Sequence, residues 1–167
     1  MTGSFEEYVA ARWPRLVRTA VLMGVDPHTA EDVAQTALSR CYVAWPRVRR
    51  AEDPDAYVHR VLINTLVDSR RRRWWGEAPT AVLPEGGLPD GAEERARGDA
   101  LRTALLRLPL GQRQVLVLRF YADLTEAAVA EALGVAVGTV KSRAARGLAA
   151  LGADRALADL LVDGVER

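Results

Sequence analysis

Apolar residues recur at steps of three and four along most of the chain, which is the spacing of one face of an α-helix. The first such stretch begins near Phe5, includes Leu16 and ends at Gly24. Pro14 lies inside this stretch, and we expect the helix to break or kink there, with Pro14 in a new first turn. The strict alternation of a half-buried strand is nearly absent. The pattern predicts an all-α protein.

The next two helices share one start signal, an aspartate followed by proline. Asp26 and Asp53 each supply an N-cap acceptor, and the proline after each suits the first helical position. We expect the first of these helices to run to Trp45 and to stop at Pro46. The second ends in four arginines and two tryptophans, residues 70–75. That density of cations beside aromatic rings is typical of nucleic-acid binding, although a solvated helix end also favours arginine.

The second half of the chain predicts two short helices joined by a glycine turn. A helical stripe stops at Pro109, and an apolar helix is expected over residues 112–121. Thr125 can cap the following helix, which Gly134 ends. A basic helix over residues 137–151 comes next. Two short helices of this kind, the second one basic, are typical of a helix-turn-helix DNA-binding motif.

The faces of that last helix separate when successive residues are placed 100° apart. One side, expected to be buried, carries Val140, Ala144, Leu148 and Leu151. The opposite side carries Ser142, Ala145, Arg146 and Ala149, with Lys141 and Arg143 on the flanks. We expect Ser142 and Arg146 to reach base edges in a major groove, and the flanking cations to reach phosphates. A helical hairpin with a solvated face is the alternative.

A stretch rich in proline and glycine lies between the two halves. Residues 78–91 contain three prolines and three glycines, which cannot sustain a helix or a central strand. Its length favours a linker over a loop within one domain. The predicted organisation is a helical domain at 1–77, a flexible acidic linker at 78–98, a helix-turn-helix domain at 99–152 and a tail at 153–167. We expect the tail to form a short amphipathic helix. Packing of this helix on the chain itself is favoured over a regulatory role.

The charge is nearly balanced, but the basic residues are unusual. The chain carries 23 basic and 22 acidic residues, and Lys141 is the single lysine. A GC-rich genome explains this bias, and arginine also offers a planar donor fork for phosphates and guanine edges. Two basic blocks, residues 1–78 and 101–152, flank an acidic stretch. A balance near zero suits a subunit that binds DNA only when a larger assembly holds it.

Several classes of protein are disfavoured by what the chain contains. Cys41 is the single cysteine, so no intrachain disulfide can form, and two histidines are too few for a structural zinc site. The sequence contains no run of 18 apolar residues, so no stretch is apolar enough to span a membrane. The sequence has no nucleophile elbow, no phosphate-binding glycine loop and no His–Glu metal motif. We therefore expect a cytoplasmic protein with no catalytic residues, no metal, no cofactor and no membrane contact.

Three stretches together resemble the extracytoplasmic-function type of RNA polymerase sigma factor. They are AEDVAQTAL and the residues on to Trp45 (30–45), DAYVHRVLINTLVD with the arginine run (55–73), and LPLGQRQVL through GTVKSR (108–143). The resemblance covers about residues 5–151, and the arginine run with two tryptophans is similar to the actinobacterial branch. The sequence departs from the family at Thr36, which is often acidic, and at Ala136, which is often a capping serine.

The resemblance implies an all-α, two-domain protein that binds core RNA polymerase and promoter DNA, with an anti-sigma factor as a further candidate partner. It implies that the first domain docks on the polymerase through Asp32, Gln35, Arg40, Tyr42 and Trp45. It implies that the −10 element is bound by Arg60, Asn64, Arg70, Arg71 and Trp74. It implies that the −35 element is bound by Lys141, Ser142, Arg143 and Arg146. A stand-alone helix-turn-helix regulator is the alternative, but it leaves residues 70–75 unexplained.

Overall fold

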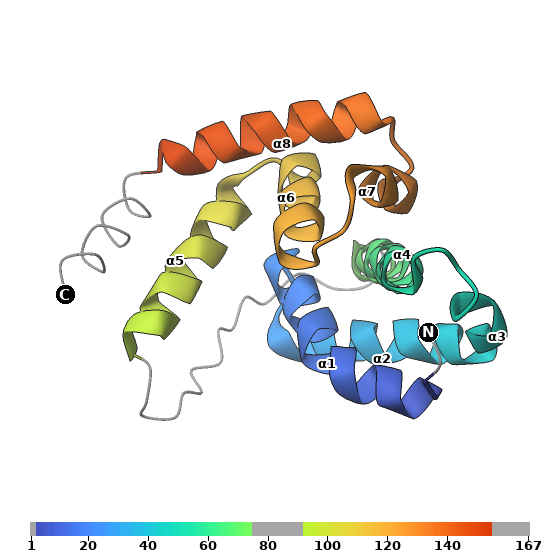
Figure 1. The fold of residues 1–167 in the computed structure, drawn as a ribbon. Coiled ribbons are helices and arrows are strands. Elements are labelled where there is room, and N and C mark those ends of the chain that lie inside the picture. The colour runs from blue at the N-terminus through green and yellow to red at the C-terminus, as the bar shows by residue number, and fades with distance from the viewer. Residues whose placement is uncertain (1–2, 75–91, 155–167) are drawn as a thin grey trace.

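The computed structural model describes the backbone of residues 3–74 and 92–154 and the side chains of residues 3–71 and 98–154. Every regular element in the described ranges is helical. Most of the predicted linker, residues 78–91, and most of the predicted tail, residues 155–167, lie outside the described residues. The helices fall into an N-terminal unit, α1–α4, and a C-terminal unit, α5–α8 (Figure 1).

Helix α1 (Phe5–Leu22) begins at a capping box, in which Ser4 and Glu7 each accept a backbone N–H of the other. It runs unbroken through Pro14, so the predicted break is wrong. Proline lacks one helical N–H, but Tyr8 and Leu16 on either side of it are buried in the core. Packing of α1 against α2 offsets the lost bond. The helix ends as predicted at Gly24, whose φ of 101° suits glycine.

The two Asp-Pro signals begin helices as predicted. Helix α2 (Pro27–Val43) starts at Asp26, which accepts the Thr29 N–H at 2.9 Å. Helix α4 (Pro54–Trp74) follows Asp53, which accepts the Ala56 N–H at 2.9 Å. The end of α2 was predicted wrongly, because Pro46 lies in the first turn of a further short helix, α3 (Trp45–Val48). A first turn needs no internal N–H partner, so proline is accepted there.

A polar cluster around Asp55 fixes α4 against α1. Asp55 accepts the Tyr8 hydroxyl at 2.8 Å and the Arg12 guanidinium at 2.8 Å and 3.2 Å. Burial and the neighbouring Asp55 raise the pKa of Tyr8, so its hydroxyl stays protonated and donates. His59, one turn further along α4, is only 3% exposed, and its Nδ1 lies 2.7 Å from the Asp55 carbonyl oxygen. These bonds orient the helix that carries the predicted −10 residues.

The C-terminal unit begins with α5 (Ala92–Arg107) and α6 (Leu110–Leu116). The predicted helix over residues 112–121 is present, but its second part is a π-helical turn, η1 (Val117–Tyr121), rather than a continuation of α6. Its backbone bond from the Ala122 N–H to the Val117 carbonyl, 2.9 Å, spans five residues. The unit continues with α7 (Glu126–Leu133) and α8 (Val137–Gly152), close to the predicted bounds.

The two units pack against each other. Helix α7 lies beside α4, and α1 contacts both α5 and η1, while α8 lies across α6 (Figure 1). Buried residues of both units, from Leu16 in α1 to Val129 in α7, belong to one continuous core. Arg15 of α1 also donates to the Tyr121 carbonyl at 2.6 Å and 3.1 Å. The two expected helical units are therefore in direct contact.

Candidate nucleic-acid interface

Helices α7 and α8 form the predicted helix-turn-helix. Thr125 caps α7 by accepting the Ala128 N–H at 3.1 Å. Gly134 ends α7 in the left-handed conformation, with φ of 65°, and so turns the chain toward α8. Ala136 occupies the N-cap of α8 and makes no side-chain bond there, as its methyl group requires. Thr125 thus sets the start of α7, Gly134 sets the turn, and α8 begins without a side-chain cap.

Helix α8 sits on α6 through a narrower face than its spacing suggests. Val140 is fully buried, and Gly147 is buried where a Cβ atom would lie 2.9 Å from Leu116 Cδ1. Leu148, predicted to be buried, is 48% exposed, so that prediction is wrong. Gly147 faces Leu116 at this contact, and the neighbouring Leu148 lies outside it. Leu148 instead lines an apolar hollow beside α5 and η1.

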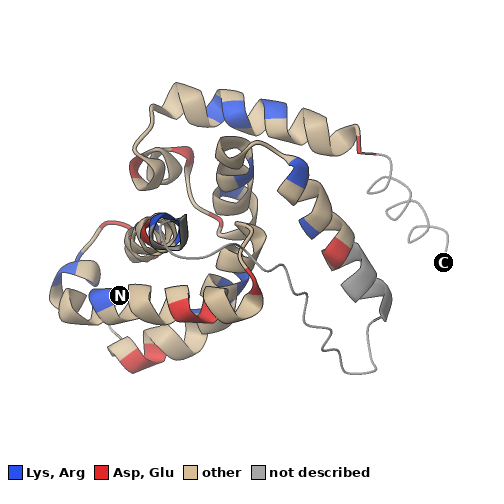
Figure 2. Ribbon diagram, turned by 180° about the vertical axis from the view of Figure 1, so that it is seen from behind, with Lys and Arg blue, Asp and Glu red and all other residues tan. Residues whose placement is uncertain are grey.

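The opposite face of α8 is open to solvent and carries the predicted base-reading residues. Ser142 and Arg146 are both exposed, and Arg146 Nε donates to the Ser142 carbonyl at 3.2 Å. Arg146 Nη2 also lies 3.3 Å from Ser142 Oγ, which itself donates to the Thr139 carbonyl at 3.1 Å. These bonds hold the guanidinium along the helix surface. Figure 2 shows basic residues at intervals along α8.

The two flanking cations of α8 are placed differently from each other. Lys141 Nζ lies 3.7 Å from Glu126 Oε2 at the start of α7, and its side chain is 65% exposed. The Arg143 guanidinium lies over α6 at Gly111, where a Cβ atom would meet its Cζ at 3.0 Å. Lys141 is therefore the more open of the two, and Gly111 leaves the room that Arg143 occupies.

The residues predicted to bind the −10 element lie along α4, and one of them is engaged by α7. Arg60 forms an ion pair with Glu131 of α7, and its guanidinium lies 5.1 Å from the ring centroid of Tyr57. Asn64 and Arg71 are exposed. The side chain of Trp74 lies outside the described residues. Asn64 and Arg71 are thus accessible, whereas Arg60 is held at the contact between the units.

Arg70 is placed differently from the other α4 arginines. Its Nη2 donates to the Met23 carbonyl at 2.7 Å, at the C-terminal end of α1. Burial lowers the pKa of Arg70. Burial also lowers the pKa of Arg113, and the positive charge of the nearby Arg70 lowers it further. Here Arg70 caps the last turn of α1, and the next residue, Arg71, is the one directed to solvent.

The predicted polymerase-binding residues share the outer side of α2 and its end. Asp32 and Gln35 are exposed and lie about one turn apart, while Val33 and Ala34 between them are buried. Arg40 donates to Thr65 Oγ1 at 3.0 Å and lies 3.4 Å from Asp68, so it bridges α2 to α4. Among the described residues no such bridge is found for Asp32 or Gln35, and both side chains are accessible on this surface.

An aromatic cluster forms the end of that surface. The Phe5 ring lies 5.1 Å from Tyr42 and 5.3 Å from Trp45, in edge-on arrangements, and Trp45 also lies 5.4 Å from Tyr8. Tyr42 is 60% exposed, whereas Trp45 is partly buried. Trp45 is therefore the inner ring of the cluster, and Tyr42 is the ring that is accessible to solvent.

No centre for redox or metal chemistry is found among the described residues. They hold no group of three or more His, Cys, Asp and Glu side chains placed to bind a metal ion. Cys41 is fully buried, and burial raises the pKa of its thiol to about 11. Within the same ranges, no helix is both long and apolar enough to cross a bilayer.

Two functionally placed residues were not predicted from the sequence. Glu131 pairs with Arg60, and Arg15 reaches Tyr121, in each case across more than 70 positions of the chain. Neither residue stands out locally, because each is one charge on a helix surface. Only the contact between the two units brings these partners together.

Comparison with known families matches both units. Residues 9–76 match Sigma-70 region 2, and residues 98–151 match Sigma-70, region 4. The chain is 40% identical over 163 residues to the RNA polymerase sigma-E factor of Streptomyces coelicolor, covering 98% of this chain and 92% of that protein. It is 31% identical over 149 residues to the ECF RNA polymerase sigma factor SigM of Mycobacterium tuberculosis, covering 89% and 75%. This chain belongs to the ECF group of RNA polymerase sigma factors.

The fold of this sigma factor also matches solved structures. It superposes on the sigma factor RpoE of Bartonella quintana, solved with the anti-sigma factor NepR, with a TM-score of 0.73 at 21% identity, covering 94% of this chain and 96% of that one. The match to CnrH, solved with the cytosolic domain of CnrY, has a TM-score of 0.64 at 24% identity, covering 89% and 85%. These matches support the arrangement of helices in the sigma factor.

Proposed function

We propose that this sigma factor binds core RNA polymerase in the cytoplasm and directs transcription initiation at promoters, reading the −35 element with α8 and the −10 element with α4. The polymerase makes the bonds, and this chain supplies recognition without catalysis. The observation that carries the proposal is the outer face of α8, where Ser142 and Arg146 stand exposed opposite the buried Val140. That face fits a major groove.

The −35 reading divides into base contacts and phosphate contacts. Arg146 offers a bidentate fork suited to the O6 and N7 acceptors of guanine, and Ser142 can bond to several bases. Lys141 and Arg143 flank this face and neutralise phosphates. The local bonds between Arg146 and Ser142 hold the guanidinium near the helix before DNA arrives. This arrangement limits the conformational entropy that binding removes.

The −10 reading uses α4 after its contact with α7 has changed. We assign capture of an unstacked base to Asn64, whose amide both donates and accepts, and backbone contacts to Arg60, Arg70, Arg71 and Trp74. One donor of Arg60 is engaged by Glu131 and one donor of Arg70 by the Met23 carbonyl, so these donors become available to a phosphate only when those bonds are released. Asn64 and Arg71 need no such change because they are exposed.

Polymerase docking is assigned to Asp32, Gln35, Arg40, Tyr42 and Trp45, with residues 1–77 as the docking and −10 domain, 78–98 as the linker and 99–152 as the −35 domain. The exposure of Asp32 and Gln35 beside the aromatic cluster supports this assignment. Replacing both residues by alanine should weaken capture of core polymerase about tenfold, equal to a loss of ~1.4 kcal/mol. Helical content by circular dichroism should not change, because both side chains are exposed.

A matched control for that variant is Glu52→Ala, which removes one exposed acid away from α2. Polymerase capture equal to that of the unmodified chain in the double variant, with the control also unchanged, would remove the docking assignment.

The decisive experiment is run-off transcription with purified core polymerase, with and without this chain. We expect promoter-specific transcripts only when both are present. The chain alone should not shift a duplex promoter fragment, since its near-zero net charge gives little independent affinity. A stand-alone helix-turn-helix regulator would shift that duplex without polymerase and would not convert the core enzyme to promoter-specific initiation.

A further inference from the structure

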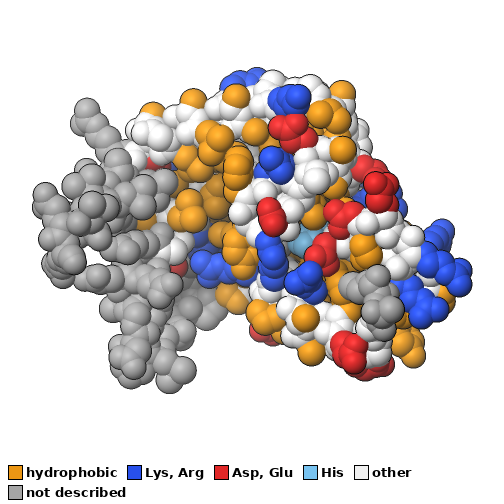
Figure 3. Space-filling view, in the orientation of Figure 1, with side chains coloured by type: hydrophobic (Ala, Val, Ile, Leu, Met, Phe, Trp, Pro, Cys, Tyr) orange, Lys and Arg blue, Asp and Glu red, His pale blue; other side chains and the backbone are white. Residues whose placement is uncertain are grey.

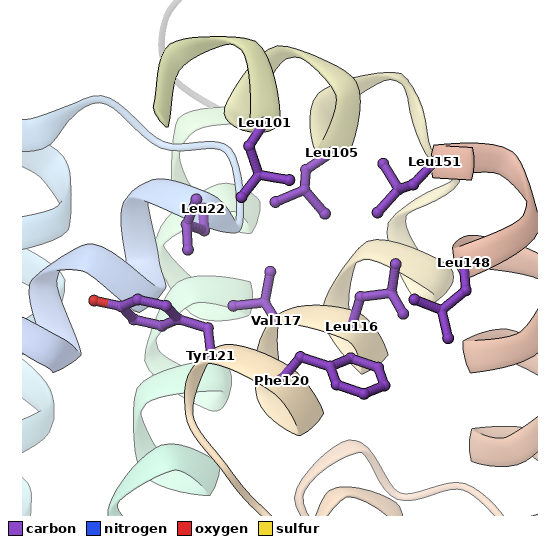
Figure 4. Close-up of a pocket in the computed structure, with 9 residues that line it drawn as sticks. All are labelled: Leu22, Leu101, Leu105, Leu116, Val117, Phe120, Tyr121, Leu148 and Leu151. Carbon is purple, nitrogen blue, oxygen red and sulfur yellow. The ribbon is translucent and has the colours of Figure 1, made fainter. Parts of the chain in front are cut away.

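An apolar hollow of about 220 Å³ opens where α1, α5, η1 and α8 meet. Its walls come from both units, with Leu22 of α1, Leu105 of α5, Val117 of η1 and Leu151 of α8 directed toward its centre (Figure 4). In the space-filling view, hydrophobic side chains gather in a depression below α8 (Figure 3). A continuous apolar surface of this kind is typical of a docking site.

The residues at the edge of the hollow are unusually exposed for their type. Phe120 is 61% exposed, Leu148 is 48% exposed and Leu101 is 40% exposed. Leu148 lies on the apolar side of α8, which was expected to be buried. No described residue covers this part of the helix. A ligand with an apolar helical face would fit the leucine-lined walls.

We propose that the C-terminal segment of this chain, residues 155–167, binds in this hollow as an amphipathic helix. Its sequence places Leu157, Leu160, Leu161 and Val165 at helical spacing on one face. At 100° per residue, the opposite face carries Arg155, Asp159, Asp163 and Glu166. The apolar face of the segment can therefore pack against the walls of the hollow, while its charged face remains in contact with solvent.

The place where the described chain ends favours this occupant over a separate molecule. Leu148 and Leu151 line the hollow, α8 ends at Gly152, and the described chain ends at Asp154, three residues after Leu151. Asp154 lies 3.0 Å from the Arg107 guanidinium at the end of α5, and its side chain is only 13% exposed. This ion pair fixes the beginning of the segment beside the hollow. A covalently attached helix starting there has a high effective concentration at its site.

The length of the segment also fits. Thirteen residues in an α-helix span about 20 Å, long enough for its three leucines and Val165 to pass along a wall built from several helices. Because Leu22 belongs to the N-terminal unit and Leu101 to the C-terminal unit, the bound segment would contact both units at once. It would thereby hold them together and occupy a surface that a partner helix could otherwise use.

Cysteine cross-linking tests the proposal in the full chain. Leu101→Cys is combined with Leu160→Cys on the apolar face of the segment, and in the matched control with Val162→Cys on its other side. The native Cys41 can remain because it is fully buried and burial raises its thiol pKa to about 11. After mild oxidation, the Leu101–Leu160 pair should form an intramolecular disulfide at least tenfold faster than the control pair.

Equal rates for the two pairs would overturn the proposal. Disulfides that join two chains and form only at high protein concentration would also overturn it, and would indicate a second copy as the occupant. Both pairs keep the core intact, since Leu101 is already 40% exposed, and circular dichroism checks this.

A second measurement needs no new cysteine. Leu161→Asp should increase hydrogen exchange at the backbone amides of residues 117–122 and 148–153 severalfold, to the level of a chain ending at Asp154. Val162→Asp, which introduces the same charge on the other face, should leave exchange unchanged. Identical exchange in the full chain, the Leu161→Asp variant and the shortened chain would overturn the proposal. Both experiments use the free chain, so they are independent of transcription.

Discussion

Helices α8 and α4 carry the two proposed DNA-reading surfaces, and the structure presents them differently. Among the described residues, the outer face of α8 bonds within its own helix-turn-helix, and Ser142 and Arg146 are open to solvent. On α4, Arg60 is paired with the other unit and Arg70 caps α1, whereas Asn64 and Arg71 are open. The proposed −35 surface is therefore complete as it stands, whereas the proposed −10 surface is completed only when Arg60 is released by the other unit and Arg70 by α1 of its own unit.

The largest expected effect is at the complete surface. Arg146→Ala should remove a bidentate contact worth about 1–3 kcal/mol and relax specificity at one position of the −35 element. Lys141→Ala should instead weaken all promoters alike and reduce the salt dependence by about one counterion. Run-off transcription from a set of −35 variants at two salt concentrations measures both. If Arg146→Ala lowered every promoter equally, another residue of α8 would be the base reader.

The packing of α8 against α6 can be tested by substitution of Gly147. A leucine there would push against the buried Leu116, so Gly147→Leu should destabilise the protein by about 2 kcal/mol, within the usual range for overpacking. Gly138→Leu in the same helix is the control, because a side chain at Gly138 meets nothing within 4 Å. Urea unfolding measures both free energies. Equal stability of the two variants would show that α8 does not depend on this close approach.

Acid should act through α4 and not through α8, which has no histidine. Burial lowers the pKa of His59 below its ordinary value, so the unfolded chain binds a proton more readily than the folded one. His59 therefore contributes stability that is present above its unfolded pKa of about 6.5 and is lost as the pH falls through its folded pKa. Urea unfolding between pH 5 and 8 should show this loss.

The matched variants for that experiment use the two histidines of the chain. His59→Gln should flatten the dependence of the unfolding free energy on pH in this range. His28→Gln, at an exposed position, should leave the dependence as it is. A steep loss of stability that persists in His59→Gln would assign it to other groups.

The smallest expected effect concerns the ion pair that holds Arg60. Its side chains are 36% and 69% exposed, so the Arg60–Glu131 pair should contribute no more than about 1 kcal/mol. A double-mutant cycle with Arg60→Gln and Glu131→Gln, measured by urea unfolding, gives the coupling energy, which should fall in high salt. Coupling well above this value would mean that Arg60 is not readily released to DNA.

Local signals in the sequence predicted most of the helices, because they act within one turn. Asp26, Asp53 and Thr125 cap the helices that they were expected to cap, and Gly24 and Gly134 end theirs. Proline was the less reliable signal. Pro14 lies inside a continuous helix and Pro46 lies in the first turn of one, because packing and position in the first turn decide the effect of a proline.

The features that were not predicted depend on contacts between distant residues. Gly147, and not Leu148, is the residue of α8 in close contact with Leu116, and the π-helical turn at Val117–Tyr121 has no local sequence signal. The engagement of Arg60 depends on Glu131, which belongs to the other unit. The roles assigned to the individual site residues remain predictions, and exposure supports those of Asn64, Arg71, Ser142 and Arg146 most directly.

The bond from Arg15 to the Tyr121 carbonyl bears on how often the two units separate. Arg15 supplies two donors to the last carbonyl of the π-helical turn, from the other unit and across an exposed site. Because water can replace these donors, the net contribution is on the order of 1 kcal/mol. A change of that size alters the ratio of joined to separated molecules about fivefold. Arg15 can thus change the proportion of molecules in which the two units are joined, but it cannot by itself keep all of them joined.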